Sequence, residues 1–222
     1  VKREHFRFYH LAAPHTIFKE NGTGGYVEIA TSHASHFAFE MQALSVDAAF
    51  KDTKASSYVV VQAWGKRQAF NYLLAQARDR MTFTKTIAAI RAMRAAFPNA
   101  NATLIEDKAN GPAIIDVLSK EIPGIIPIEP TGSKEARAEA VAPLIHAGNV
   151  VLPCPDEAPW VEAFISEWLA VPTGAFWDQV DAADQYLLKY GRTYSVNVPA
   201  GSAGAEMSVE VDVSGSPWGM NR

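Results

Sequence analysis

The sequence predicts an α/β fold in which one mixed sheet of five strands is covered by helices on both faces. Three strand-like stretches lie close together between residues 43 and 76, which is typical of an antiparallel meander. From residue 82 onward, amphipathic helical stretches alternate with short apolar ones, which is typical of βα units. The chain has 222 residues, 48% of them hydrophobic and 20% charged, so it can bury a full core.

The meander is expected to begin with a buried strand at residues 43–49, which ends near Asp47. A second strand is expected at 57–64 because it is rich in β-branched residues. Gly65-Lys66-Arg67 makes the tight connection to a third strand at 68–76.

The second half of the core alternates between the two periods. The expected elements are, in order, a helix at 82–97, a strand at 102–106, a helix at 111–120, a strand at 125–128, a helix at 134–147, a small strand at 150–152, and helices at 157–170 and 178–190. Pro98 ends the first helix, and Ser133 is a suitable N-cap for the helix that Gly148 stops.

Three regions are expected along the chain. Residues 1–42 form a lead-in segment packed on the core domain, which spans 43–191. Residues 192–222 form a tail, either a strand pair or partly disordered, because they are rich in Gly, Ser and Val without a helical period. The first residue is not methionine, which we interpret as an excised domain of a longer protein.

Composition excludes several classes of protein. No apolar run approaches the roughly 20 residues of a membrane span, so no membrane partner is expected. Cys154 is the single cysteine, which excludes an internal disulfide, fits a reducing compartment and indicates a buried structural thiol. The net charge is −4, so any nucleic-acid-binding surface must be local.

Carboxylates follow two of the predicted strands. Asp47 lies near the end of the first strand, and Glu106 and Asp107 end the fourth. If these strands are neighbours, the acids meet at one edge of the sheet, where α/β proteins bind their ligands. Strand alternation directs Glu106 and Asp107 to opposite faces, so one of the two is expected to aim at Asp47.

The last helix supplies further acids. Asp178 and Asp181 lie on one face, opposite the apolar residues, and Asp184 lies nearer the apolar boundary. Taken singly, each acid is typical of a helix start, where carboxylates are favourable. Together with Asp47, they form an oxygen-only set that suits Mg²⁺ or Mn²⁺. Two such ions about 3.5–4 Å apart would stabilise the attacking and leaving oxygens of a phosphodiester.

Basic residues lie near these acids and near the first hairpin. Such side chains contact a nucleic-acid backbone without reading bases. The candidates for DNA binding are Lys108, Lys134, Arg137, Lys66 and Arg67. Lys51 also flanks the hairpin, while Lys54 and Arg94 are better explained as solvated surface charge.

The acids lie in segments whose order and spacing are distinctive. They read Ser45-Val-Asp-Ala-Ala-Phe-Lys, Leu104-Ile-Glu-Asp-Lys-Ala-Asn-Gly, Ser133-Lys-Glu-Ala-Arg, Gly148-Asn-Val-Val-Leu-Pro and Trp177-Asp-Gln-Val-Asp-Ala. This order resembles the C-terminal nuclease domain of the large terminase subunit of tailed bacteriophages. The resemblance covers about residues 1–190.

The resemblance implies that the core at 43–191 is an RNase H-like nuclease. It implies a metal-dependent endonuclease that cuts concatemeric viral DNA during packaging, largely independently of sequence. It further implies metal ligation by Asp47, by Glu106 or Asp107, and by Asp178 and Asp181. Lys134 and Arg137 match a basic pair of the family.

The resemblance also implies partners and a location. The partners are double-stranded DNA, the N-terminal packaging ATPase domain of the same full-length protein, the capsid portal and the small terminase subunit. The implied location is the host cytoplasm. No Gly-x-x-x-x-Gly-Lys-Ser/Thr motif occurs here, so the ATPase is expected outside this chain.

Two departures from the family pattern bear on a second ion. Phe176-Trp177-Asp178 stands where many members have His-Asp-Asp, and Ser56-Ser57 stands where some members carry an extra Asp. The alternatives are another RNase H-like nuclease, such as a junction resolvase or a transposase, an idle module that docks DNA or the portal, and an α/β enzyme acting on small phosphate esters.

Overall fold

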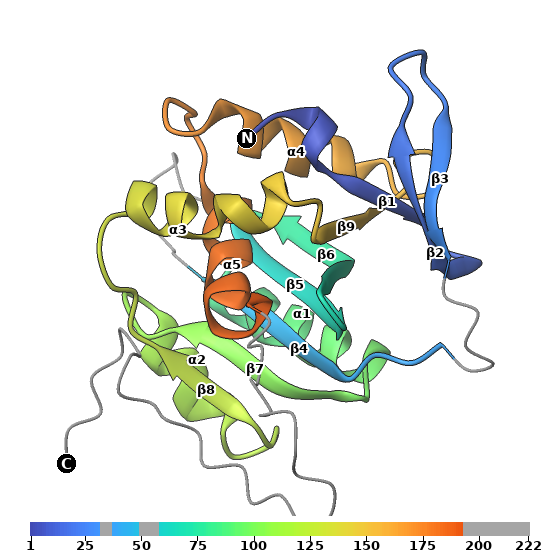
Figure 1. Ribbon diagram of the computed structural model, residues 1–222. Helices are drawn as coiled ribbons and strands as arrows, with labels where there is room; N and C mark the ends of the chain where they lie inside the picture. Colours follow the sequence, from blue (N-terminus) through green and yellow to red (C-terminus); the bar gives the residue numbers. More distant parts are fainter. Residues whose placement is uncertain (32–36, 49–57, 193–222) are drawn as a thin grey trace, which may run out of the picture.

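A mixed sheet of nine strands runs through the described part of the molecule (Figure 1). The computed structural model describes residues 1–31, 37–48 and 58–192. The predictions for Lys51, Lys54, Ser56, Ser57 and the tail from residue 193 on fall outside these ranges. The order across the sheet is β3 (Tyr26–Thr31), β2 (Ala13–Glu20), β1 (Arg7–His10), β9 (Val150–Pro153), β6 (Phe70–Asp79), β5 (Val59–Arg67), β4 (Met41–Asp47), β7 (Ala100–Glu106) and β8 (Ile125–Ile128).

The sheet is mixed as predicted, but five strands were too few for the described residues. The meander β4–β5–β6 is antiparallel, and β7 and β8 extend it in parallel on the β4 side. On the other side β9 pairs in parallel with β6 and with β1, and β1 begins an antiparallel β1–β2–β3 ribbon. The N-terminal residues therefore extend the sheet as further strands, because β9 pairs with β6 on one side and with β1 on the other.

Helices cover both faces of the sheet, as predicted (Figure 1). Strand alternation separates two cores: Leu44 and Val46 belong to one cluster, and Ala43 belongs to the other. The first cluster takes in α1 (Phe83–Ala96) and α2 (Gly111–Leu118). The second takes in α3 (Lys134–His146), α4 (Trp160–Ala170) and α5 (Asp178–Tyr186).

The predicted helices are confirmed with small changes at their ends. Thr82 and Ser133 cap α1 and α3 by accepting hydrogen bonds from Lys85 N and Ala136 N. The last helix is shorter than predicted, because α5 gives way at Leu187 to a π-helical turn that ends at Gly191. Within the described ranges, no helix has the length and apolar character needed to span a membrane.

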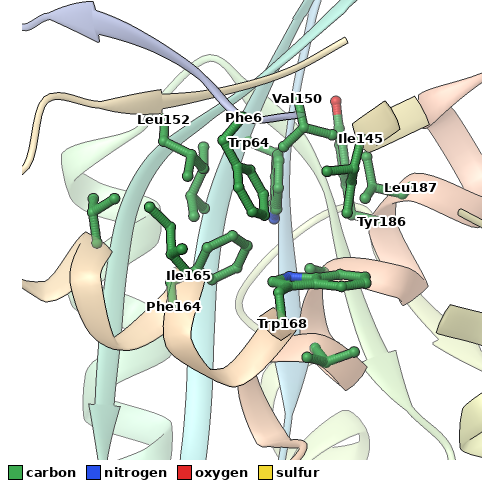
Figure 2. Packing of buried hydrophobic residues seen from close by; sticks show 14 of the residues in the cluster. Phe6, Trp64, Ile145, Val150, Leu152, Phe164, Ile165, Trp168, Tyr186 and Leu187 are labelled. Atoms are coloured by element: carbon green, nitrogen blue, oxygen red, sulfur yellow. The ribbon is translucent and has the colours of Figure 1, made fainter. Parts of the chain in front are cut away.

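Aromatic packing fixes α5 against the sheet. The Trp64 indole of β5 stacks on the Tyr186 ring with a centroid distance of 4.8 Å and an interplanar angle of 9°. Figure 2 shows this pair together with Trp168, Phe164 and other side chains of the same cluster. Both stacked rings are fully buried, and such a pair contributes about 0.5–1.5 kcal/mol beyond its buried area. The helix that carries three aspartates is thereby held in one position.

Candidate functional site

Two neighbouring parallel strands end in carboxylates at the same edge of the sheet. Val46 of β4 pairs with Ile105 of β7, so the next residues, Asp47 and Glu106, lie side by side. Alternation places both on the face that α5 covers, as it does Ala43. The conditional prediction that the first and fourth strands are neighbours is confirmed.

Helix α5 lies over β4 and β5 and is buried on every side. All nine of its residues, from Asp178 to Tyr186, are buried, including all three of its aspartates. Gln185 Nε2 donates to Ser45 Oγ at 2.9 Å, which joins the helix to the middle of β4. Burial of these acids argues against the alternative that they are merely solvated charges at a helix start.

Burial and neighbouring carboxylates raise the pKa values of two acids at this edge, Asp47 and Glu106. Asp47 is 5% exposed, and burial raises its pKa well above the usual range. The negative charges of Asp181, Glu106 and Asp178 raise it further. Burial and the charge of Asp181 also raise the pKa of Glu106. Four carboxyl groups from β4, β7 and α5 therefore share one electrostatic site.

Asp178 interacts with a different neighbour. Burial raises its pKa first, and the charge of Glu167 raises it next. Its Oδ2 is buried and accepts no hydrogen bond within the described part of the chain. A buried carboxylate oxygen without a donor is costly, and a bound cation would offset that cost.

Two basic residues from α3 hold Asp181. Lys134 Nζ donates to Asp181 Oδ2, and Arg137 Nη2 donates to Asp181 Oδ1 at 2.7 Å. Burial acts to lower the pKa of Lys134, but the hydrogen bond to Asp181 and the nearby negative charges outweigh it, and the pKa is raised. Lys134 and Arg137, two of the five predicted DNA contacts, therefore lie at the site, where both pair with Asp181.

Asp184 is an acid of this site that sequence reasoning did not choose. It is 1% exposed, its Oδ2 lies 3.4 Å from Arg137 Nε, and neither oxygen accepts a hydrogen bond from a described residue. Burial raises its pKa well above the usual range, although the charge of Arg137 opposes the rise. Its three-residue spacing from Asp181 was the available signal.

A cavity of about 700 Å³ opens beside the cluster. Acidic side chains from β7 and α5 form one part of its wall, and apolar residues from β8 and α3 form another. Its lining includes Glu106, Asp107, Asp181, Asp184, Arg137, Ile126, Ile128, Pro130, Ala136 and Ala140. Asp107 therefore borders the cavity, but it is not among the main charges that act on Asp47.

The donor types fit a hard divalent cation, but their present arrangement does not. No group of three or more acidic, histidine or cysteine side chains in the described ranges is placed so that it could hold a metal ion. Both oxygens of Asp181 are taken by Lys134 and Arg137. An ion ligated by Asp181 would therefore share this carboxylate with two positive charges and compete with them.

The other predicted DNA contacts lie in two places. Lys108 follows the acidic strand end, with its Nζ 3.5 Å from Pro130 O. Lys66 and Arg67 lie at the opposite end of β5 from the residue that pairs with Asp47. There, Lys66 Nζ donates to Tyr190 O at 2.5 Å and Arg67 Nη1 donates to Ala38 O at 2.8 Å. The structure does not bring these two to the acidic cluster.

Glu167 of α4 caps α5 from a distance. Its Oε1 accepts from the backbone N–H groups of Gln179 at 2.6 Å and Val180 at 3.2 Å. The N-cap residue Trp177 makes no side-chain cap of its own. A carboxylate at this position satisfies free N–H groups and complements the helix dipole. Glu167 thereby also fixes the position of the first turn of α5, which carries Asp178 and Asp181. No residue close to α5 in the sequence indicates this role of Glu167.

The single cysteine has neighbours that resemble a nucleophilic triad. Cys154 Sγ lies 3.8 Å from His10 Nε2, and His10 Nδ1 lies 3.1 Å from Glu157 Oε1. The thiol is fully buried, and burial raises its pKa to about 12. A reactive cysteine needs a lowered pKa and access, so the prediction of a structural thiol is supported.

Comparisons with known proteins agree with this geometry. The family model described as "Terminase RNaseH-like domain" matches residues 44–189. That range contains every residue of the acidic cluster. A comparison with curated protein sequences found no match.

Several solved structures share the fold. The g2p (large terminase) nuclease domain of bacteriophage SPP1 with bound Mn has a TM-score of 0.55 at 12% identity, covering 85% of this chain and 98% of that one. The large terminase nuclease of thermophilic phage G20c with bound zinc has a TM-score of 0.54 at 17% identity, with coverages of 68% and 81%. The large terminase of a second thermophilic bacteriophage has a TM-score of 0.52 at 12% identity, covering 68% of this chain and 40% of that one. These likenesses confirm the predicted RNase H-like fold.

Proposed function

Because the chain belongs to the family of terminase RNaseH-like domains, we propose that this terminase nuclease is an endonuclease that cuts double-stranded DNA with Mg²⁺ or Mn²⁺. The DNA is concatemeric viral DNA, and the cut is largely independent of sequence. One observation carries the proposal: the buried carboxyl of Asp47 interacts with acids from two other elements. Several crowded carboxylates are costly in a folded protein unless they hold cations.

The residues would divide the work as follows. Asp47, Glu106, Asp178 and Asp181 would hold the ions, and Asp184 and Asp107 border the same space. When bound, a pair of such ions supplies an activated water and stabilises the developing charge on the phosphate oxygens. Oxygen-only ligands favour Mg²⁺ or Mn²⁺ over softer metals.

The basic residues would bring the phosphate backbone to the acids. The side chain of Lys134 is 52% exposed, so it can reach DNA as well as Asp181. Lys108 lies on the same edge of the sheet, next to the acidic strand end. Structures of the terminase nucleases of G20c and SPP1 contain bound zinc, magnesium, cobalt or Mn, which supports a divalent ion here too.

The wider assembly follows from the family. We propose that this nuclease works with a packaging ATPase domain N-terminal to it in one full-length protein, and with the small terminase subunit and the capsid portal. The host cytoplasm is the proposed location. The large terminase of the second thermophilic bacteriophage has also been solved in complex with ATP-γ-S, which supports the first of these partners.

Cleavage of plasmid DNA tests the proposal. The parent protein and Asp47→Asn are compared with Mg²⁺, with Mn²⁺ and with EDTA. Asp116→Asn is the matched control, because it removes a carboxylate whose side chain is 72% exposed on α2. We expect metal-dependent nicking by the parent and the control, and none above background by Asp47→Asn.

Four results would contradict the proposal. Full activity of Asp47→Asn would exclude this acidic site, and full activity in EDTA would exclude the metal. DNA binding without cleavage by the parent in any metal would favour an idle docking module. A strong preference for branched over linear duplex would point to a junction resolvase.

A further inference from the structure

Two arginines and two aromatic rings gather beside the acidic cluster. The Arg78 guanidinium carbon lies 3.8 Å above the Tyr58 ring centroid, and that of Arg80 lies 5.4 Å from the same centroid. Phe176 meets Tyr58 edge-on with a centroid distance of 5.4 Å. We call these four residues the arginine–aromatic surface. Tyr58 comes directly before β5, Arg78 and Arg80 lie at the end of β6 and directly after it, and Phe176 precedes α5.

Strand register fixes this surface relative to the site. Val60 of β5 pairs with Asp47 on one side and with Arg78 on the other, so the three residues form one row across the sheet. Residues in one row point to the same face, and two strand spacings separate Asp47 from Arg78 by about 10 Å. Phe176 lies two residues before Asp178. The surface therefore continues the acidic edge along the same side of the sheet.

The arginine–aromatic surface is partly exposed to solvent, and its two arginines make few polar contacts with described residues. Phe176 is 45% exposed, and Arg80 is exposed and makes no ion pair with a described residue. Arg78 reaches Glu167 through one long contact of 3.3 Å, and its Nε has no hydrogen-bond partner in the described ranges. Asp79 lies between the arginines, but strand alternation turns it to the other face of the sheet.

This chemistry matches a nucleic-acid strand. Guanidinium groups bind phosphate oxygens in a bidentate manner, and aromatic and guanidinium planes stack on bases or on the deoxyribose. An acidic peptide would satisfy the arginines, but it offers no flat face for Phe176 and Tyr58. Duplex DNA rises about 3.4 Å per base pair along its axis, so a surface about 10 Å from Asp47 lies within a few base pairs of the proposed cleavage position.

We propose that the arginine–aromatic surface binds the DNA strand on one side of the scissile phosphate. The arginines contact phosphates, and Phe176 packs on a base or sugar. This inference rests on the proposed function, since it uses the acidic cluster as the place of cleavage. It assigns the strand a path along the ends of β7, β4, β5 and β6.

DNA binding by a double variant tests the inference. Arg80→Ala with Phe176→Ala is made in an Asp47→Asn background, so that Mg²⁺ is present and the DNA stays intact. The matched control is Lys19→Ala with Leu11→Ala, which removes one exposed cation and one exposed apolar side chain near β2. Fluorescence anisotropy with a labelled duplex is read at several salt concentrations.

We expect the double variant to bind DNA roughly five- to a hundredfold more weakly, the range for losing one stacked contact. The slope of log affinity against log salt should become shallower by about 0.9, the value for one phosphate contact. The control should bind as the Asp47→Asn parent does. Unchanged affinity and slope in the double variant would overturn the inference.

Cleavage by the same changes in the active protein separates the two proposals. In one outcome, the double variant binds DNA more weakly while the protein with Asp47 intact does not cut DNA. In that case the arginine–aromatic surface is supported and only the nuclease proposal fails. Normal binding and normal cutting by the double variant would leave the nuclease proposal intact and exclude the surface. No DNA binding by the parent would overturn both.

Discussion

The two ends of the β4–β5 hairpin place charged residues in opposite circumstances. At one end, Lys66 donates to the carbonyl oxygens of Tyr190 and Arg192, and Arg67 donates to that of Ala38. These charges meet acceptors that the fold itself supplies. At the other end, Asp47 is buried among carboxylates whose charges raise its pKa.

The difference separates charge that serves stability from charge that serves chemistry. A cation on free carbonyl groups at a helix end is favourable in itself. Carboxylates buried together are unfavourable in themselves and are retained where a ligand compensates them. The acidic end of the hairpin is therefore the end that we propose as the functional site, whereas Lys66 at the basic end stabilises the turn that follows α5.

The sharpest test of the acidic end compares two adjacent carboxylates. Glu106 acts electrostatically on Asp47 and lies beside it, whereas Asp107 only borders the cavity. We expect Glu106→Gln to lower the rate of DNA cleavage by more than about 100-fold, beyond the loss typical of residues that merely support a metal ligand. Asp107→Asn should lower it only a few-fold.

The two variants control for each other, because each removes one charge at adjacent positions. Rates are measured at saturating Mn²⁺ on nicked-plasmid gels, and circular dichroism checks that both variants are folded. Equal losses would mean that the cluster does not distinguish the two acids. A larger loss for Asp107→Asn would reverse the assignment.

The raised pKa of Asp47 also predicts that the stability of the protein depends on pH. Because the folded-state pKa of Asp47 is raised, the folded protein binds a proton there more tightly than the unfolded chain does. The contribution of Asp47 to stability is therefore full at low pH and is lost as the pH rises above about 4, by at most about 1.4 kcal/mol per pH unit.

Asp47→Asn removes this titration, so without metal the variant should become progressively more stable than the parent between pH 4 and neutral pH. Urea unfolding at several pH values measures the difference, and Asp116→Asn on α2 should show no such trend. A constant difference across the range would show that Asp47 keeps an ordinary pKa.

The basic end predicts a smaller effect on stability alone. Lys66→Met keeps the length of the side chain but leaves the carbonyl groups of Tyr190 and Arg192 without the ammonium. Since Lys66 is partly exposed, we expect a loss of about 1 kcal/mol in the free energy of unfolding. The cleavage rate of the folded enzyme should stay the same. Lys120→Met, at an exposed site just after α2, is the control, and reduced cleavage without reduced stability would instead indicate a DNA contact.

This contrast also explains what the sequence could and could not predict. Asp47 and Glu106 were identifiable because strand ends are local features, and the meander followed by βα units predicted that their strands could be neighbours. The same reasoning placed α1, α2 and α3 within a few residues. Each of these inferences depends on a pattern of residues that are close together in the sequence, so the sequence alone was sufficient to make it.

The features that escaped prediction depend on distant contacts. Glu167 caps α5 from another helix, and no pattern near residue 178 announces it. The acceptors of Lys66 were also not predictable, because they are carbonyl groups of residues more than 120 positions away. The strands β1 to β3 were missed because the edge they join is formed by β9, which lies about 140 residues further along the sequence.

The smallest expected effect concerns the competition between a lysine and a metal ion. Lys134 and Arg137 each donate to one oxygen of Asp181, so an ion at this carboxylate competes with two positive charges. Lys134 is the more exposed of the two and therefore the easier to displace. We expect Lys134→Ala to bind Mn²⁺ roughly two- to fivefold more tightly, the range for a partly exposed ion pair. Lys134→Arg, which keeps the charge, should bind as the parent does.

Isothermal titration calorimetry without DNA isolates this effect from any role of Lys134 on the phosphate backbone. The metal-free variant should also be slightly less stable, because Asp181 loses a partner while it stays buried. Weaker metal binding by Lys134→Ala would show that the lysine orients Asp181 as a ligand and does not compete for it. The acidic end would then resemble the basic end, with its charges already matched before any ion arrives.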